Sequence, residues 1–161
     1  MENKARIVNI LLDKYVLETE NGECIEAIIR KNAKKGKSIL VGDNVVYEKI
    51  DKDFVISKIL DRKNELIRPP VANIDNLVIV VSIANPSPDY ILLDKEIALC
   101  EAKNITPIIC VNKIDLDDNG EIEYIKKVYS KLGIKVIYTS AMEGIGIDEL
   151  KDTLKGKVSA F

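Results

Sequence analysis

Histidine and tryptophan are absent from the 161-residue sequence, and cysteine occurs only at positions 24, 100 and 110. Three widely spaced cysteines without any histidine provide neither a disulfide framework nor a zinc site, so we expect no metal in this chain and a reducing compartment. No apolar run approaches the ~20 residues that cross a bilayer, and the N-terminus lacks the apolar region of a signal peptide. The sequence therefore predicts a soluble, cytoplasmic protein without a membrane partner.

A strong charge of one sign is also missing. The 24 basic and 26 acidic residues leave a net charge of −2, so the overall charge demands neither a nucleic acid nor a membrane as partner. The hydrophobic fraction of 47% is sufficient for a packed core. This length accommodates one ordinary domain or two small ones.

The first 68 residues predict an all-β domain, because short segments rich in Ile, Val and Tyr alternate with turn signals. Asn21-Gly22 predicts a two-residue hairpin turn of type I′, and Gly42-Asp43 predicts a bend or bulge. Five short strands in this length are typical of a small OB-type barrel, although an SH3-like barrel would show much the same pattern. The predicted strands are Ala5–Leu11, Tyr15–Glu20, Cys24–Arg30, Asn44–Ile50 and Phe54–Leu60.

The longest connection in this predicted barrel contains five basic residues and no acidic one. Such a loop could neutralise RNA phosphates without reading their sequence, but a solvated hairpin tip has the same composition. Gly36-Lys37-Ser38 resembles the end of a phosphate-binding loop. We reject that motif because its first glycine would fall on Lys31 and no helix start follows it. The candidate RNA contacts are Arg30, Lys31, Lys34, Lys35 and Lys37.

Pro69-Pro70 interrupts the β pattern, and strands alternate with helices from Val71 onward. We therefore predict an RNA-binding OB domain over residues 1–68 and an α/β domain over residues 69–161. Strands are expected over 74–84, 106–112 and 134–138, and Ser87-Pro88 predicts the N-cap and first residue of the first helix. Gly133 and Gly156 predict the ends of the next two helices. This alternation is typical of a parallel, doubly wound sheet.

The predicted strand that ends near residue 112 delivers polar side chains to its carboxyl end, where ligands bind in open α/β sheets. A carboxylate such as Asp115 can accept hydrogen bonds from both N1 and N2 of guanine, whereas adenine lacks both donors. Asn112-Lys113-Ile114-Asp115 therefore predicts a guanine-specificity loop. A strand-to-helix turn with local Asn and Asp caps is the simpler alternative.

Ser140-Ala141 follows the next predicted strand, one strand–helix unit later. The backbone N–H of Ala141 could donate to guanine O6, and its small side chain would let the base approach. We therefore expect the nucleotide-binding residues to be Asn112, Lys113, Ile114, Asp115, Ser140 and Ala141. We expect no catalytic residue in this chain.

Together these segments resemble the amino-terminal half of the circularly permuted GTPases of small-ribosomal-subunit biogenesis, the RsgA (YjeQ) family. In that family an OB domain precedes the GTPase domain, and the guanine-reading segments precede the phosphate loop. The resemblance implies that Asp115 reads guanine N1 and N2, Asn112 supports the base edge and Lys113 lies along the ring face. It rests on Val41-Gly42-Asp43, residues 64–75, Leu92-Leu93-Asp94, Asn112–Asp115 and Thr139-Ser140-Ala141.

The resemblance further implies a GTP hydrolase that binds GTP or GDP with Mg²⁺ and acts in late maturation of the small ribosomal subunit. Its OB domain would contact ribosomal RNA, and the full-length family is expected to be monomeric. The family's Gly-x-x-Gly-x-Gly-Lys-Ser phosphate loop and carboxyl-terminal zinc domain have no counterpart in these residues. We therefore expect a partial GTPase domain in a truncated chain that binds GTP weakly or not at all, with negligible turnover.

Two other interpretations remain open from the sequence. The chain could be a non-catalytic RNA- or ribosome-binding OB module whose α/β half is a vestigial scaffold. Alternatively, it could be an inert fragment that associates through an apolar sheet edge.

Overall fold

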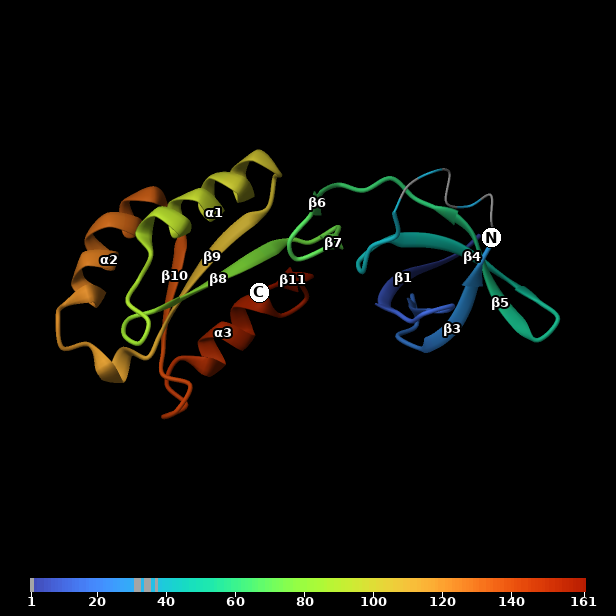
Figure 1. The fold of residues 1–161 in the computed structure, drawn as a ribbon. Coiled ribbons are helices and arrows are strands. Elements are labelled where there is room, and N and C mark those ends of the chain that lie inside the picture. Colours follow the sequence, from blue (N-terminus) through green and yellow to red (C-terminus); the bar gives the residue numbers. More distant parts are fainter. Residues whose placement is uncertain (1, 31–32, 34–35, 37) are drawn as a thin grey trace. The chain divides into compact units, whose positions relative to one another are not determined.

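The computed structural model describes residues 2–30, 33, 36 and 38–161, and the chain forms two compact units (Figure 1). The first unit is Met1–Asn73 and the second is Ile74–Phe161. Among the described residues, no helix has both the length and the apolar character needed to cross a membrane.

The first unit contains a closed five-stranded barrel, as the sequence predicts. Neighbouring strands follow the order β1-β2-β3-β5-β4, and β1 pairs with both β2 and β4. The β3–β5 pair is parallel, whereas the other pairs are antiparallel. This order is that of an OB barrel, so the OB-type prediction is confirmed. The strands are β1 (Asn3–Ile10), β2 (Tyr15–Thr19), β3 (Cys24–Ile29), β4 (Asn44–Ile50) and β5 (Asp53–Ile59).

The barrel core consists of alternate residues from these strands, because successive side chains point to opposite faces of a sheet. Ile7, Leu17, Val45 and Ile56 are fully buried, and partly buried aromatic and aliphatic side chains pack around them. At about 25 cal/mol per Å² of buried apolar surface, such side chains supply most of the free energy that stabilises the barrel.

The turn between β2 and β3 differs from the predicted type I′ geometry. Only Gly22 has a positive φ, of 80°, and its N–H donates to the carbonyl of Thr19 at 2.9 Å. The N–H of Thr19 also donates to the carbonyl of Glu23, which makes the loop longer than two residues. A type I turn followed by a left-handed glycine explains this geometry, so Asn21 need not adopt positive φ.

A short hairpin of β6 (Glu65–Leu66) and β7 (Val71–Ala72) follows the barrel within the first unit. Its packing explains the Gly42-Asp43 signal: Gly42 has φ 93°, and a Cβ atom there would lie 2.0 Å from the carbonyl oxygen of Ala72. Asn73 donates through Nδ2 to the carbonyl of Gly42 at 2.9 Å. The close approach of these two backbones therefore requires glycine at position 42.

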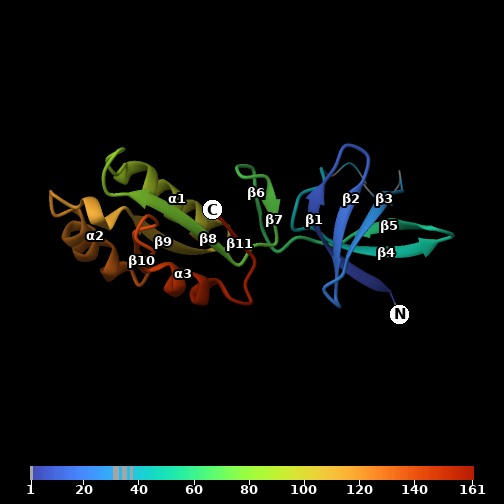
Figure 2. The ribbon, with the colours of Figure 1, turned by 90° about the horizontal axis from the view of Figure 1, so that it is seen from below.

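The second unit is a parallel, doubly wound α/β sheet, as predicted, with strand order β10-β9-β8-β11 (Figures 1 and 2). Helices α1 and α2 cover one face, and Leu150 and Leu154 of α3 pack on the other face against Val78, Cys110 and Ile137. The elements are β8 (Asn76–Ser82), α1 (Tyr90–Ala102), β9 (Thr106–Asn112), α2 (Glu121–Tyr129), β10 (Lys135–Thr139), α3 (Ile147–Leu154) and β11 (Ser159–Ala160), with 3₁₀ turns at Ile114–Leu116 and Ser130–Leu132.

The start of α1 differs from the prediction. Asp89 is the N-cap, and its carboxylate accepts the N–H of Leu92 at 2.9 Å. Ser87-Pro88 therefore lies in the loop before the helix. Ser87 and Asp89 are both residue types that favour the N-cap position. The helix begins after Asp89 because its side chain is the one that accepts the N–H of the third helical residue.

Candidate guanine-binding site

Parallel pairing brings the ends of three strands to one edge of the sheet. Ser82 of β8 pairs with Asn112 of β9, and Asn112 pairs with Thr139 of β10. The base loop, defined as residues 112–115, therefore lies between the loop that follows β8 and the turn that follows β10. Figure 2 shows these three strands side by side. This is the edge where parallel α/β sheets bind their ligands.

Asn112 connects the base loop to the turn after β10. Its Oδ1 atom accepts a hydrogen bond from Thr139 Oγ1 at 3.1 Å and another from the N–H of Ala141 at 3.2 Å. Thr139 is buried, and its hydroxyl also lies 3.4 Å from the sulfur of Cys110. Within the described residues, the Nδ2 group of Asn112 has no hydrogen-bond partner. That amide is therefore available as a donor to a bound base.

Lys113 adopts a left-handed backbone conformation, with φ 64° and ψ 37°. For a residue with a Cβ atom this conformation costs about 1–2 kcal/mol, so the surrounding structure must compensate for it. The Nζ atom of Lys113 donates to the carbonyl of Ala84 at 3.1 Å and to the carbonyl of Asn85. These bonds hold the side chain across the loop that follows β8.

Asp115 lies in the 3₁₀ turn Ile114–Leu116 and is exposed. Its carboxylate forms no hydrogen bond or ion pair with any residue in the described part of the chain. Both oxygens are therefore open to paired donors from a ligand. Ile114, between Lys113 and Asp115, is half-buried.

Asp117 fixes the chain after the base loop, a role that the sequence analysis missed. Its carboxylate accepts the N–H of Glu121 at 2.9 Å and that of Ile122 at 3.3 Å, at the start of α2. The hydroxyl of Tyr90 donates to Glu121, and burial together with that carboxylate raises the pKa of Tyr90 above its usual range. Asp117 lies three residues before the N-cap of α2, Gly120, so the usual cap signal of a polar residue at the N-cap does not identify it.

The turn after β10 is held by Ser140. The side chain of Ser140 is buried, and its hydroxyl accepts the N–H of Glu143 at 3.3 Å. Its backbone N–H and carbonyl pair with Ile145 at 3.1 and 3.0 Å. A Cβ atom at Gly146 would lie 2.1 Å from the carbonyl oxygen of Tyr138, so glycine is required there. Ser140 thus shapes the turn that presents Ala141.

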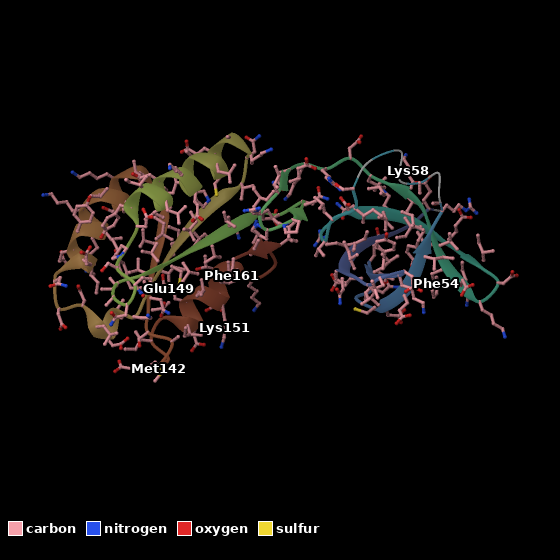
Figure 3. All side chains as sticks on the ribbon, viewed as in Figure 1. Phe54, Lys58, Met142, Glu149, Lys151 and Phe161 are labelled. Atoms are coloured by element: carbon pink, nitrogen blue, oxygen red, sulfur yellow. The ribbon has the colours of Figure 1, made fainter. Side chains whose placement is uncertain are left out.

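Ala141 is exposed, and the next residue, Met142, projects into solvent and is 93% exposed (Figure 3). The N–H of Ala141 already donates to Asn112 Oδ1. To donate to guanine O6, as the sequence predicts, this N–H must turn from Asn112 or be shared with it. The structure therefore brings all six predicted residues to one edge of the sheet and gives Ser140 a supporting position.

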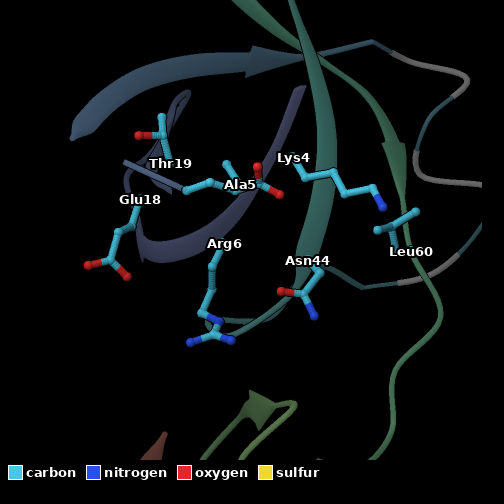
Figure 4. Close-up of a pocket in the computed structure, with 8 residues that line it drawn as sticks. Lys4, Ala5, Arg6, Glu18, Thr19, Asn44 and Leu60 are labelled. Atoms are coloured by element: carbon cyan, nitrogen blue, oxygen red, sulfur yellow. The ribbon is translucent and has the colours of Figure 1, made fainter. Parts of the chain in front are cut away.

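Of the five predicted RNA contacts, Arg30 is among the residues that the structure describes. Arg30 lies at the end of β3 and forms an ion pair with Glu48, with 3.3 Å between Nη1 and Oε1. Lys31, Lys34, Lys35 and Lys37 lie outside the described residues. The barrel also has an outer groove of about 390 Å³ whose lining includes Lys4, Arg6, Glu18 and Asn44 (Figure 4).

Within the described residues, no three His, Cys, Asp or Glu side chains cluster closely enough to hold a metal ion. The side chains gathered at this edge of the sheet offer hydrogen-bond donors and acceptors of the kind that suit the edge of a base.

Comparison with known proteins agrees with this architecture. The profile of the RsgA GTPase family matches residues 59–161. The chain is 42% identical over 160 residues to the small ribosomal subunit biogenesis GTPase RsgA of Caldanaerobacter subterraneus, covering 98% of this chain and 54% of that protein. It is 43% identical over 154 residues to the RsgA of Ruminiclostridium cellulolyticum, covering 91% of this chain and 49% of that protein. The chain thus spans about half the length of these relatives.

Two solved structures have the same fold. YjeQ from Thermotoga maritima superposes with a TM-score of 0.89 at 33% identity, covering 99% of this chain and 59% of that one. YloQ, described as a circularly permuted GTPase, gives a TM-score of 0.81 at 33% identity, covering 99% of this chain and 58% of that one. With its barrel, its parallel sheet and the order of its polar loops, the chain belongs to the RsgA GTPase family.

Proposed function

We propose that this chain is the base-reading part of a ribosome-biogenesis GTPase that binds guanine nucleotide and assists late maturation of the small ribosomal subunit. The observation that carries this proposal is the convergence of residues 112–115 and 140–141 at one sheet edge, with the carboxylate of Asp115 unpartnered within the described residues. Its relatives carry the name small ribosomal subunit biogenesis GTPase.

In the proposed complex each residue has a separate role. Asp115 accepts the N1 and N2 protons of guanine, and Asn112 donates through Nδ2 to the base edge. The stem of Lys113 lies along the ring face, and the N–H of Ala141 donates to O6. Ile114 and Ser140 hold the two loops in place. Adenine offers neither the N1 proton nor the N2 amino group, so the site excludes it.

The 161 residues contain no Gly-x-x-Gly-x-Gly-Lys-Ser loop, so these residues alone lack a cradle for the phosphates. We therefore expect them to bind guanine nucleotides weakly and to hydrolyse GTP negligibly. In the complete enzyme, Mg²⁺ would neutralise charge on the phosphates, whereas the residues described above orient the base. A cytoplasmic monomer with a separate barrel domain over residues 1–68 is part of the same proposal.

A titration with nucleotides of different bases tests the proposal. GDP, XDP and ADP are added to ¹⁵N-labelled chain at millimolar concentrations, and backbone amide shifts are followed at residues 112–116 and 141. GDP should move these signals and ADP should not. Xanthine carries a carbonyl in place of the N2 amino group, so Asp115→Asn should weaken GDP binding and strengthen XDP binding. Equal shifts with ADP and GDP would contradict guanine recognition.

Asp118→Asn is the matched control for this titration, because it makes the same chemical change at an exposed position three residues further along. Its preference should remain GDP over XDP. A change of preference in both variants would mean that the lost charge, and not the geometry at Asp115, determines binding.

A second candidate function is a non-catalytic RNA- or ribosome-binding module, which the closed OB-type barrel favours. In this proposal the residues 30–37 loop contacts rRNA phosphates. Changing Lys31, Lys34, Lys35 and Lys37 to Glu should then weaken binding to the small ribosomal subunit and reduce its salt dependence. Unchanged, salt-insensitive binding would remove this candidate.

A further inference from the structure

The loop that follows β8 is tied to the base loop, although no predicted site residue lies in it. The N–H of Ile83 donates to the carbonyl of Asn112 at 3.1 Å. The ammonium of Lys113 donates to the carbonyls of Ala84, at 3.1 Å, and Asn85. Two successive residues of the base loop thus bond to three successive residues of the β8 loop, residues 83–86.

The carbonyls that receive Lys113 are themselves held in place. Ser82 donates through its hydroxyl to the carbonyl of Ala84 at 2.7 Å, so this oxygen accepts two hydrogen bonds. Ile83 is buried, and Asn85 has a left-handed backbone with φ 48°. A reversal of the chain at Asn85 directs two consecutive carbonyls toward one ammonium, which an extended backbone would point in opposite directions.

The partners of Lys113 are uncharged. Within the described residues, no carboxylate lies within ion-pairing distance of its Nζ atom. Charge-assisted hydrogen bonds to carbonyls are stronger than neutral ones, so they can hold the side chain in a single position. Because Lys113 is immobilised before a ligand arrives, binding does not have to order this long side chain.

We propose that the β8 loop is a positioning element of the guanine site, in which the carbonyls of Ala84 and Asn85 hold Lys113 and Ser82 orients the first of them. This inference rests on the proposed guanine recognition and extends it to residues outside the base loop. The side chains of Asn112 and Lys113 then bond to different neighbours: Asn112 to the turn after β10, and Lys113 to the loop after β8. The base loop is fixed from both sides.

The tether is tested first without any nucleotide. Lys113→Met keeps the length of the stem and removes the ammonium. Amide hydrogen exchange at Ile83 and at residues 113–116 should become about tenfold faster, because charge-assisted bonds that close the loop are lost. Exchange at Val78 and Ile109 in the core should not change. Lys127→Met, at an exposed position on α2, is the matched control and should leave all of these rates unchanged.

A double-mutant cycle then tests whether the β8 loop acts through Lys113. The chain, Ser82→Ala, Lys113→Met and the double variant are titrated with GMP, and the shifts at residues 112–116 report the affinity. Ser82→Ala alone should weaken GMP about fivefold, the effect of one hydrogen bond. Added to Lys113→Met, it should cause no further loss. Ser87→Ala, at the exposed position directly after this loop, is the control.

The outcomes separate this inference from the proposed function. Additive losses in the cycle, or unchanged exchange at Ile83 in Lys113→Met, would overturn the positioning role. If GMP and AMP shift the wild-type signals equally, guanine recognition fails. In that case the exchange measurement alone decides whether the β8 loop holds Lys113.

Discussion

The hydroxyl oxygen of Thr139 lies 3.1 Å from Oδ1 of Asn112, and this hydrogen bond joins the ends of two neighbouring parallel strands. Asn112 is the first residue of the base loop, and Thr139 is fully enclosed by the core. The bond therefore connects the packing of the sheet directly to the orientation of a residue proposed to read the base.

Thr139→Val should lower the free energy of unfolding by about 0.5–1.5 kcal/mol, because it preserves the shape of the side chain but removes the hydrogen bond of a buried hydroxyl. It should also shift the amide signals of Asn112 and Ala141 and weaken GMP binding. Denaturant titration and NMR measure the two effects. Thr106→Val, at the exposed start of the neighbouring strand β9, should change stability by less than about 0.5 kcal/mol. Equal losses in both variants would contradict the role of the bond.

The sequence was sufficient to predict that the base loop and Ser140-Ala141 meet. Both segments follow short apolar strands, and in a parallel sheet such ends lie at one edge. The barrel was predictable for a similar reason, since alternation and turn residues mark its five strands. These inferences need only periodicity and chain direction.

The contacts within the site were not predictable in this way. The tether of Lys113 depends on the direction of two backbone carbonyls, which the left-handed conformation of Asn85 determines. Thr139 looks like any threonine at the end of a strand until its partner is known. The predicted start of α1 was wrong for a related reason. Ser87 and Asp89 are both typical cap residues, and only the side chain of Asp89 bonds to the helix.

Gly146→Ala should disrupt the turn that presents Ala141. The substitution introduces a Cβ atom 2.1 Å from the carbonyl of Tyr138 at a position with φ 72°. Gly120→Ala is the matched control, because φ is 76° there and no atom lies within 4 Å of the added Cβ. The control should lose only about 1–2 kcal/mol of stability, which is the cost of a left-handed backbone for a residue with a Cβ atom.

The comparison of these two variants separates backbone strain from collision. Thermal unfolding should show a larger loss for Gly146→Ala, and the amide signals of Ser140 and Ala141 should move only in that variant. Equal effects would mean that the close approach to Tyr138 is readily relieved.

Arg62→Met should destabilise the barrel by about 3–5 kcal/mol, because it leaves a buried carboxylate without its partner. Arg62 contacts both carboxylate oxygens of Asp43, at 2.7 and 2.9 Å, and Asp43 is completely buried. Hydrogen bonding to this carboxylate raises the pKa of Arg62 above its usual range, so the guanidinium stays charged. Hydrogen exchange at Leu17 in the barrel core measures the loss.

Arg68→Met is the matched control for this ion pair, because it removes the same charge from an exposed side chain that bonds to none of the described residues. It should leave exchange at Leu17 unchanged. Exchange at Ile109, in the second unit, should respond to neither variant if the two units unfold separately.

The second unit should lose stability in alkaline solution, and the ionisation of Cys100 should determine the pH at which this loss begins. Burial raises the pKa of the Cys100 thiol from about 9 to about 11, with a smaller contribution from Glu96. A pKa that is higher in the folded state means that folding favours the bound proton. The stabilisation is therefore complete below pH 9 and is lost as the pH rises toward 11.

The rise in the pKa of Cys100 from about 9 to about 11 limits its effect on the free energy of unfolding to about 3 kcal/mol. Burial also raises the pKa of Tyr90 and Tyr129, so their contributions are lost at still higher pH. Unfolding of the second unit should be followed by hydrogen exchange or denaturant between pH 8 and pH 11. Cys100→Ala removes the thiol, so its stability should fall less steeply over this range even if its value at pH 8 is lower. A slope identical to that of the unsubstituted chain would show that the thiol stays protonated to the same extent in the folded and unfolded states.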